Sequence, residues 1–204
     1  MPNDEGMTQH PSQMIQTTTS LTLNDAIRHS EFVISSPMSN YASSRPRPTQ
    51  EPISIAVVAS LYNNQFVQGL LNAVKEEIEV IAPNASLDVY RVPGAFEIPV
   101  CTELVLRGSA PDAVIALGVI IRGSTEHADL VGASVTDALQ QMAVKHCVPV
   151  IHEVLLVSSE EQAEERCLGA TINRGTEAAQ TCVKMINLFG KMKASFAGEP
   201  IDHA

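Results

Sequence analysis

From residue 53 onward, short apolar runs alternate with amphipathic stretches, and these two patterns predict different elements. Residues 53–59 are mostly apolar and β-branched, which predicts a strand covered on both faces. Residues 66–81 repeat their apolar side chains every three or four positions, which predicts a helix with one buried side. The same patterns predict further strands over 86–92, 113–121 and 148–157, and further helices over 95–107, 127–145, 159–166 and 173–193.

This alternation of strands and helices predicts an α/β fold in which a parallel sheet lies between two layers of helices. We expect a three-layer, flavodoxin-like sandwich whose four strands, numbered along the chain, lie in the order 2-1-3-4. Ligands of such sheets bind beyond the carboxyl ends of the strands. Functional side chains should therefore follow Ala59, Val92, Ile121 and Val157.

Residues 1–52 differ in composition from the rest of the chain, because they hold half of the twelve prolines and are rich in serine and threonine. Such a segment buries too little apolar surface to offset the entropy lost on ordering, so we expect a low-complexity, mostly disordered extension. One short helix over 21–34 is compatible with its pattern. The predicted organisation is this extension, a domain over 53–196 and a C-terminal tail over 197–204.

The extension and the cysteines both bear on localisation. The extension is serine-rich, as organellar transit peptides are, but acidic residues such as Glu5 and Asp25 disfavour that interpretation. The four cysteines are widely spaced and form no CxxC pair, which favours reduced thiols in a cytosolic protein. We expect a cytoplasmic protein, with an organellar location as the alternative.

The charge balance narrows the range of partners. The net charge is −10 and the pI is about 5.0, which argues against nucleic acid and anionic membranes, since both require a positive surface. No apolar run approaches the ~20 residues that a membrane-spanning helix needs. A small anionic substrate stays possible, because a few well-placed arginines can outweigh distant negative charge.

The segment 118–127, GVIIRGSTEH, joins the third predicted strand to a helix through a glycine-containing loop. Backbone N–H groups at such a helix start attract anions, and Ser124 and Thr125 each add a hydroxyl donor. His127 follows at once and could transfer protons near neutral pH. The alternatives are an ordinary turn with a capping hydroxyl and a polar surface histidine, and spacing alone leaves both open.

A second segment, 91–99, places a Pro93–Gly94 turn at the end of the second predicted strand. Phe96 and Glu97 follow, and together they suit a planar heteroaromatic ligand with hydrogen-bond donors. The equally acceptable alternative buries Phe96 in the core and makes Glu97 a first-turn helix charge.

Arg166 ends a third segment, an acidic helix that is followed by Cys-Leu-Gly. It could clamp a phosphate with its two-pronged guanidinium. The alternative, an ordinary ion pair within the acidic helix, is slightly favoured by the sequence alone.

Taken together, these segments resemble the lumazine synthase (6,7-dimethyl-8-ribityllumazine synthase) family over about 53–196. Residues 92–99 match its VPGAFEIP motif without change, and 118–127 match GxVIRGxTxH with Ile120 in place of valine. Residues 162–166 resemble its QAxER segment, and 173–179 resemble NKGxEAA. The resemblance implies a transferase of riboflavin biosynthesis that condenses 5-amino-6-(D-ribitylamino)uracil with 3,4-dihydroxy-2-butanone 4-phosphate. Its products are 6,7-dimethyl-8-ribityllumazine, phosphate and water.

The resemblance also implies roles for individual residues. His127 would transfer protons, and Ser124, Thr125 and Arg166 would bind the phosphate. Arg174 stands for a family lysine and supports the site with its charge. The residues that would hold the pyrimidine and its ribityl chain follow the second strand or end the third: Ala95, Phe96, Glu97, Val119, Ile120 and Ile121.

Two segments depart from the family pattern on the ring-binding side. An RFN-like segment reads Leu61-Tyr62-Asn63, which makes Tyr62 the stacking candidate, and an FGVLT-like stretch reads HEVLL, with His152 in place of the ring-covering phenylalanine. These changes motivate one alternative function, a flavin- or lumazine-binding homologue with weak or no turnover. Another alternative, an unrelated flavodoxin-like signalling domain, is disfavoured because the phosphate loop follows the third strand rather than the first.

The family's chemistry implies no cofactor and no metal, in agreement with the lack of a metal-ligand motif in the sequence. The resemblance further implies a homo-oligomer, either a pentamer or a 60-subunit icosahedral shell, whose sites are shared between subunits.

Overall fold

The computed structural model describes residues 44–197. Residues 1–43 and 198–204 lie outside the described residues, and so do the helix expected over 21–34, most of the predicted extension and nearly all of the predicted tail. A four-stranded parallel sheet runs through the described part in the order β2-β1-β3-β4, which confirms the predicted α/β fold and strand order. Its strands are β1 (Ser54–Ser60), β2 (Ser86–Val92), β3 (Ala113–Ile121) and β4 (Val150–Val157).

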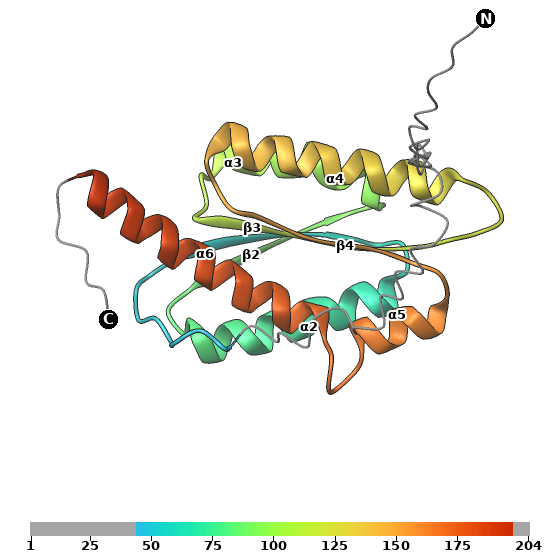
Figure 1. Cartoon of the computed structure of the whole chain (residues 1–204), viewed down its shortest axis with the longest axis horizontal. Helices are drawn as coiled ribbons and strands as arrows, with labels where there is room; N and C mark the ends of the chain where they lie inside the picture. The colour runs from blue at the N-terminus through green and yellow to red at the C-terminus, as the bar shows by residue number, and fades with distance from the viewer. Residues whose placement is uncertain (1–43, 198–204) are drawn as a thin grey trace, which may run out of the picture. The chain divides into compact units, whose positions relative to one another are not determined.

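Helices cover both faces of this sheet, as predicted (Figure 1). One layer holds α2 (Asn64–Ile81), α5 (Glu160–Cys167) and α6 (Arg174–Phe196). The other holds the short 3-10 helix η1 (Ala95–Glu97), α3 (Ile98–Gly108) and α4 (His127–His146).

The single helix expected over 95–107 is instead divided into η1 and α3. Pro99 lies in the first turn of α3, where its missing N–H leaves no hydrogen bond unmade. The tighter η1 turn precedes it, so the chain changes direction at the end of β2 before the longer helix begins.

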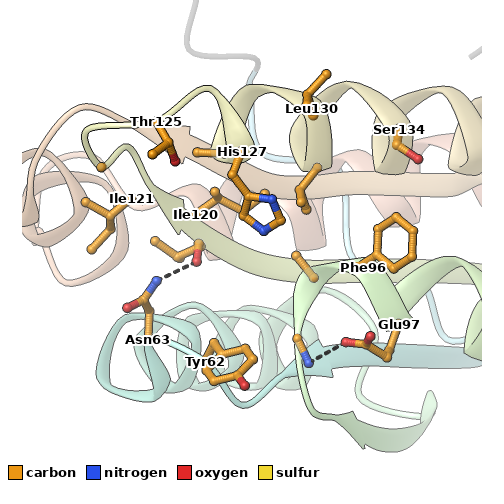
Figure 2. Close-up of a pocket in the computed structure, with 16 residues that line it drawn as sticks. Tyr62, Asn63, Phe96, Glu97, Ile120, Ile121, Thr125, His127, Leu130 and Ser134 are labelled. Atoms are coloured by element: carbon orange, nitrogen blue, oxygen red, sulfur yellow. Dashed lines mark hydrogen bonds between the residues drawn. The ribbon is translucent and has the colours of Figure 1, made fainter.

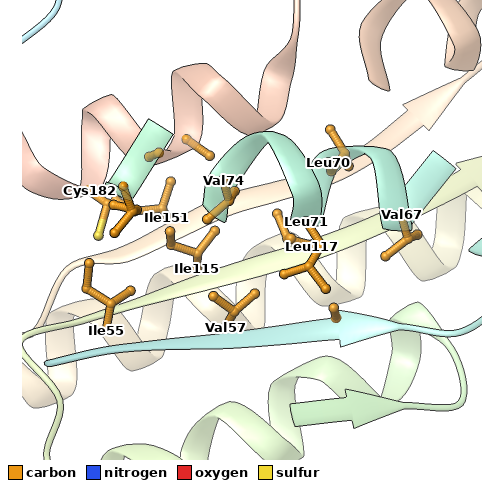
Figure 3. Packing of buried hydrophobic residues seen from close by; sticks show 14 of the residues in the cluster. Ile55, Val57, Val67, Leu70, Leu71, Val74, Ile115, Leu117, Ile151 and Cys182 are labelled. Carbon is orange, nitrogen blue, oxygen red and sulfur yellow. The ribbon is translucent and has the colours of Figure 1, made fainter. Parts of the chain in front are cut away.

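Two hydrophobic clusters, one on each face of the sheet, explain why the sequences of the central strands do not alternate between apolar and polar residues. In β1, Ile55 and Val57 face α2 and α6, while Ala56 and Val58 face α3 and α4. Figure 3 shows the first cluster, in which Leu70 and neighbouring side chains of α2 lie over the strands. A strand buried on both faces reads as a continuous apolar run.

Glu77 is a buried carboxylate between α2 and α6, with an exposed fraction of only 5%. It accepts a hydrogen bond from Arg45 Nε (2.7 Å) and another from Gln180 Nε2 (2.9 Å), and it forms an ion pair with Arg45. The hydrogen bond from Arg45 lowers the pKa of the Glu77 carboxyl. Thr49 N–H also donates to the Ile81 carbonyl (2.9 Å), so the chain before β1 is tied to the end of α2.

Glu103 joins α3 to α4. Its carboxylate binds Lys145 Nζ (2.7 Å) and His146 Nε2 (2.8 Å) across the helix pair and Arg107 (2.6 Å) within α3. The hydrogen bonds from Lys145, His146 and Arg107 lower the pKa of this carboxyl to about 2.

This cluster predicts how stability depends on pH. The Glu103 carboxyl has a lower pKa in the folded chain than its unfolded value of about 4.3, so its contribution is complete above pH ~4.3 and is lost as the pH falls toward 2. We expect Glu103→Gln to have a lower Tm than the wild type at pH 6, and this gap should narrow as the pH falls below ~4 and be lost near pH 2. Glu79→Gln, at an exposed glutamate of α2 without a salt bridge among the described residues, is the matched control. A gap that persists unchanged at pH ~2.5 would contradict the assignment.

Candidate active site

A cavity of about 850 Å³ opens at the carboxyl ends of the central strands, where the sequence predicted the functional residues (Figure 2). The ends of β1 and β3, the η1 turn and the first two turns of α4 form its wall. Nine of the predicted site residues line it together: Tyr62, Ala95, Phe96, Glu97, Val119, Ile120, Ile121, Thr125 and His127.

Asn63 fixes the turn after β1. Its backbone is left-handed (φ 55°), a conformation that asparagine tolerates better than most residues, and its Nδ2 donates to the Val119 carbonyl of β3 (2.8 Å). Tyr62 N–H donates to the Pro93 carbonyl (3.1 Å). These bonds hold the Tyr62 ring at the cavity wall, where it is 71% exposed.

Gly94 allows the Tyr62 ring to lie close to the chain. A Cβ at this position would lie 2.9 Å from Tyr62 Cδ2 and 2.9 Å from Glu97 Oε2, so a larger residue would displace one of the two side chains. Gly94 N–H donates to Glu97 Oε2 (2.9 Å), and the other carboxylate oxygen has no partner among residues 44–197. Glu97 is therefore oriented by one oxygen and can accept a ligand's hydrogen bond with the other.

Phe96 is 62% exposed and lines the cavity, so the alternative that buries it in the core is wrong. In Figure 2 the rings of Tyr62 and Phe96 line the same cavity as the ring of His127, which extends from the first residue of α4. Exposed aromatic rings at the edge of a cavity provide stacking surfaces for a planar ligand.

His127 is the first residue of α4, and neither of its ring nitrogens has a hydrogen-bond partner in the described part of the chain. Thr125 lines the cavity beside it, close to the amino-terminal end of α4, where backbone N–H groups favour an anion. Arg122, in the same loop, is already paired with Asp129 (2.7 Å), which occupies its guanidinium. An imidazole and a helix start that favours anions are therefore adjacent.

Several cavity residues were not assigned from the sequence. Leu130, Val131 and Ser134 line the cavity at three, four and seven positions after His127, so helical spacing counted from His127 would have found them. Asn63 adjoins Tyr62 in the segment already singled out. The others are Gly94, Gly123 and Ala128.

Four predicted residues lie outside this cavity: Ser124, His152, Arg166 and Arg174. Ser124 is exposed in the loop before α4. His152 lies on β4 on the α4 side, with its Nε2 2.9 Å from Thr136 Oγ1. The Thr136 hydroxyl donates to the Gly132 carbonyl (2.8 Å), and in that arrangement it can accept a hydrogen bond from the His152 Nε2–H.

Arg166 is exposed at the end of α5 and forms no salt bridge with any described residue, although four glutamates belong to the same helix. The ion-pair alternative for Arg166 is therefore wrong, and its guanidinium is available for a ligand. Arg174, at the start of α6, binds Glu153 (2.8 Å) and Glu177 (2.5 Å).

The described residues contain neither a membrane-spanning helix nor a metal-binding cluster. No helix within 44–197 is both long and apolar enough to span a membrane. Over the same range, no three His, Cys, Asp or Glu side chains gather in a way that could hold a metal ion.

Comparison with known proteins points to one family. The family model of 6,7-dimethyl-8-ribityllumazine synthase matches residues 52–190. The 6,7-dimethyl-8-ribityllumazine synthase of Leuconostoc mesenteroides is 33% identical over 141 residues, covering 69% of this chain and 90% of that protein. The synthase of Chlorobium phaeobacteroides is 39% identical over 138 residues, with 66% and 87% covered, and that of Chlorobium limicola is 38% identical over 141 residues, with 67% and 89% covered.

Proposed function

The chain belongs to the 6,7-dimethyl-8-ribityllumazine synthase family, and from this premise we propose that the cavity around His127 is its active site. The protein is a transferase of riboflavin biosynthesis. It condenses 5-amino-6-(D-ribitylamino)uracil with 3,4-dihydroxy-2-butanone 4-phosphate to give 6,7-dimethyl-8-ribityllumazine, phosphate and water. The observation that carries the site assignment is the adjacency of His127, Thr125 and the α4 amino terminus to the aromatic edge of the cavity.

The reaction needs proton transfers beside a leaving phosphate. The amine of the pyrimidine attacks the ketone carbonyl and forms an imine with loss of water; a proton then leaves the carbon next to the phosphate-bearing carbon as the C–O bond to phosphate breaks. His127 carries out proton transfer in these steps, because both ring nitrogens are available in the cavity. Ser124, Thr125 and Arg166 bind the phosphate, since hydroxyl and guanidinium donors suit a dianion.

The pyrimidine binds on the other side of the cavity. Tyr62 and Phe96 offer their rings to it, and the second carboxylate oxygen of Glu97 accepts a hydrogen bond from a donor of the ring or the ribityl chain. Ala95 and the stretch Val119–Ile120–Ile121 complete the wall.

The direct test is to incubate the purified chain with both substrates and follow lumazine fluorescence. Product above the rate without enzyme is expected. If no product forms while the pyrimidine or lumazine still binds, the protein is instead a binding homologue without turnover.

We further propose a homo-oligomer, a pentamer or a 60-subunit shell, in which a neighbouring copy completes each site. Arg166 and His152 lie outside the cavity of their own chain, which fits their supply by a second copy to a substrate bound there. An exposed, unpaired Arg166 supports this arrangement. Light scattering should give a mass well above that of one chain, and a monomer that is fully active would refute it.

Mixing two inactive variants tests the shared site directly. His127→Asn removes the proton-transfer group, and Arg166→Met removes the phosphate ligand. If the two residues of one site come from different copies, co-assembled variants contain some intact sites, and activity should recover to about a quarter of the wild-type value in randomly mixed closed rings. Mixing two separately prepared His127→Asn samples is the control and should restore none. If no activity returns although co-assembly of the two variants is verified, His127 and Arg166 belong to a site within one chain.

We propose a cytoplasmic location, with no nucleic acid or membrane partner. Cys167 and Cys182 are buried free thiols, as expected in a reducing compartment, and the net charge of −10 disfavours polyanionic partners. Imaging of the full-length protein fused at its C-terminus to a fluorescent tag would test the compartment, and an organellar signal would refute the proposal.

A further inference from the structure

Arg166 and Arg174 lie on the two sides of the turn between α5 and α6, and the hydrogen bonds of one side chain, Asn173, link the two helices there. The Asn173 side chain donates from Nδ2 to the Cys167 carbonyl at the end of α5 (3.1 Å) and accepts from Gly175 N–H at the start of α6 (2.9 Å). Arg166 is the residue before Cys167, and Arg174 is the residue after Asn173. One amide side chain therefore fixes the positions at which both guanidinium groups leave the backbone.

Glu153 lies beneath this turn, on the face of β4 that α5 and α6 cover. It is 5% exposed, and its Oε1 accepts from Arg174 Nε (2.8 Å). Burial raises the pKa of the Glu153 carboxyl, and the charges of Arg174 and Arg166 oppose this rise. Arg166 thus acts on the same carboxylate electrostatically without bonding to it.

The guanidinium of Arg174 is only partly used by these contacts. Its Nε binds Glu153 and its Nη1 binds Glu177 (2.5 Å), while its Nη2 has no partner among the described residues. Arg166 has no ion pair in residues 44–197. The turn is therefore flanked by two arginines with unused N–H donors, which is the donor set that binds a phosphate monoester.

We propose that Glu153 is a positioning residue for the phosphate of the butanone substrate: its buried carboxylate holds the Arg174 guanidinium in place, so that Arg174 and Arg166 bind the phosphate together. This inference rests on the proposed function, because it takes Arg166 as a phosphate ligand. Glu153 does not touch the substrate. It acts by restricting Arg174 to one orientation, so that the unused donors are already arranged when the anion arrives.

The experiment compares Glu153→Gln with the wild type, both as full-length oligomers. The amide keeps the size of the side chain but removes the charge that orients Arg174. Calorimetry with inorganic phosphate and the KM for the butanone phosphate should both show weaker binding by about tenfold, the typical loss for one charge-assisted hydrogen bond. The KM for the pyrimidine should change by less than about twofold, roughly within the scatter of such measurements.

Glu77→Gln is the matched control. Glu77 is also 5% exposed and also paired with an arginine, but its partner is Arg45, between α2 and α6. It should lose stability as Glu153→Gln does, yet keep wild-type affinity for phosphate. If Glu153→Gln does not fold, Glu153→Asp replaces it, because the shorter side chain keeps the charge but draws it away from Arg174; several-fold weaker phosphate binding is then expected.

Unchanged phosphate affinity in the Glu153 variant overturns the proposal, as does an equal loss in Glu77→Gln, which would indicate a general effect of instability. The proposed function fails separately. A wild-type protein that forms no lumazine refutes the reaction, whereas the phosphate titration still tests Glu153 in that case.

Discussion

Replacing His127 by asparagine is expected to lower kcat for lumazine formation by about 10²-fold, the usual contribution of one positioned acid–base group. Asparagine keeps a polar side chain of similar reach but cannot accept and release a proton at neutral pH. The His127 ring lies in the cavity beside Thr125, and neither of its ring nitrogens has a hydrogen-bond partner among the described residues. Steady-state kinetics with both substrates should show the loss in kcat with little change in either KM, because the group acts mainly in the transition state.

Ser134→Ala provides the control for His127, since Ser134 lines the same cavity two turns further along α4. It should retain kcat within a few-fold of the wild type, roughly the effect of losing one neutral hydrogen-bonding group. A His127 variant whose KM rises while kcat is preserved would mean that the ring binds substrate rather than moving protons.

The second large effect is expected at Gly175, where α6 crosses α2. A Cβ at this position would lie 2.3 Å from the Leu70 carbonyl oxygen and 3.0 Å from Ala73 Cβ. The carbonyl belongs to the backbone of α2, so the clash can be relieved only by moving one helix against the other. We expect Gly175→Ala to lower the free energy of unfolding by about 3 kcal/mol, at the upper end for an overpacked core, measured by urea denaturation.

Gly190→Ala tests whether the loss of stability in Gly175→Ala comes from the clash with α2 or from a change in helix propensity. Gly190 is in the same helix, and apart from its chain neighbours and the nearby backbone of that helix no described atom lies within 4 Å of the position its Cβ would take. Alanine there should stabilise the protein by about 0.5–1 kcal/mol, because it favours the helix without meeting a neighbour. Similar destabilisation by both substitutions would rule out the contact between α2 and α6 as the cause.

The sequence predicted the fold well because the central strands are buried on both faces. The run over residues 113–121 is apolar throughout, so it lacks the polar face of an amphipathic helix, and the turn after it contains Gly123, Ser124 and Thr125. The strand order followed from the parallel βαβ connections. The division of 95–107 was not foreseen, because η1 depends on how the Gly94 N–H meets the Glu97 carboxylate in three dimensions.

The residues of the candidate site could be predicted where they are consecutive in the sequence, and less well where they meet only through contacts in the folded chain. Phe96, Glu97 and His127 stand in long motifs that directly follow strands, so the sheet topology alone brings them to one edge. The sequence slightly favoured an ion pair for Arg166 within its acidic helix, although the glutamates near it are poorly placed to face it. The structure leaves Arg166 without a salt bridge to any described residue. The pair of Glu153 with Arg174 joins residues from two elements, and no local pattern marks it.

Arg45 precedes the first strand, yet its charge neutralises a buried carboxylate, so the folded unit extends to this residue on its amino-terminal side. The apolar pattern begins only with the first strand, but the carboxylate of Glu77 is enclosed by α2 and α6 and has Arg45 as its one arginine partner among the described residues. A chain trimmed to begin at Ser44 keeps that counter-charge. One trimmed to begin at Arg47 would leave a buried anion facing only the amide of Gln180, so it would take up a proton or draw in water. Two shortened proteins of nearly equal length, each with every described strand and helix intact, would therefore differ in acid tolerance and in solubility when expressed.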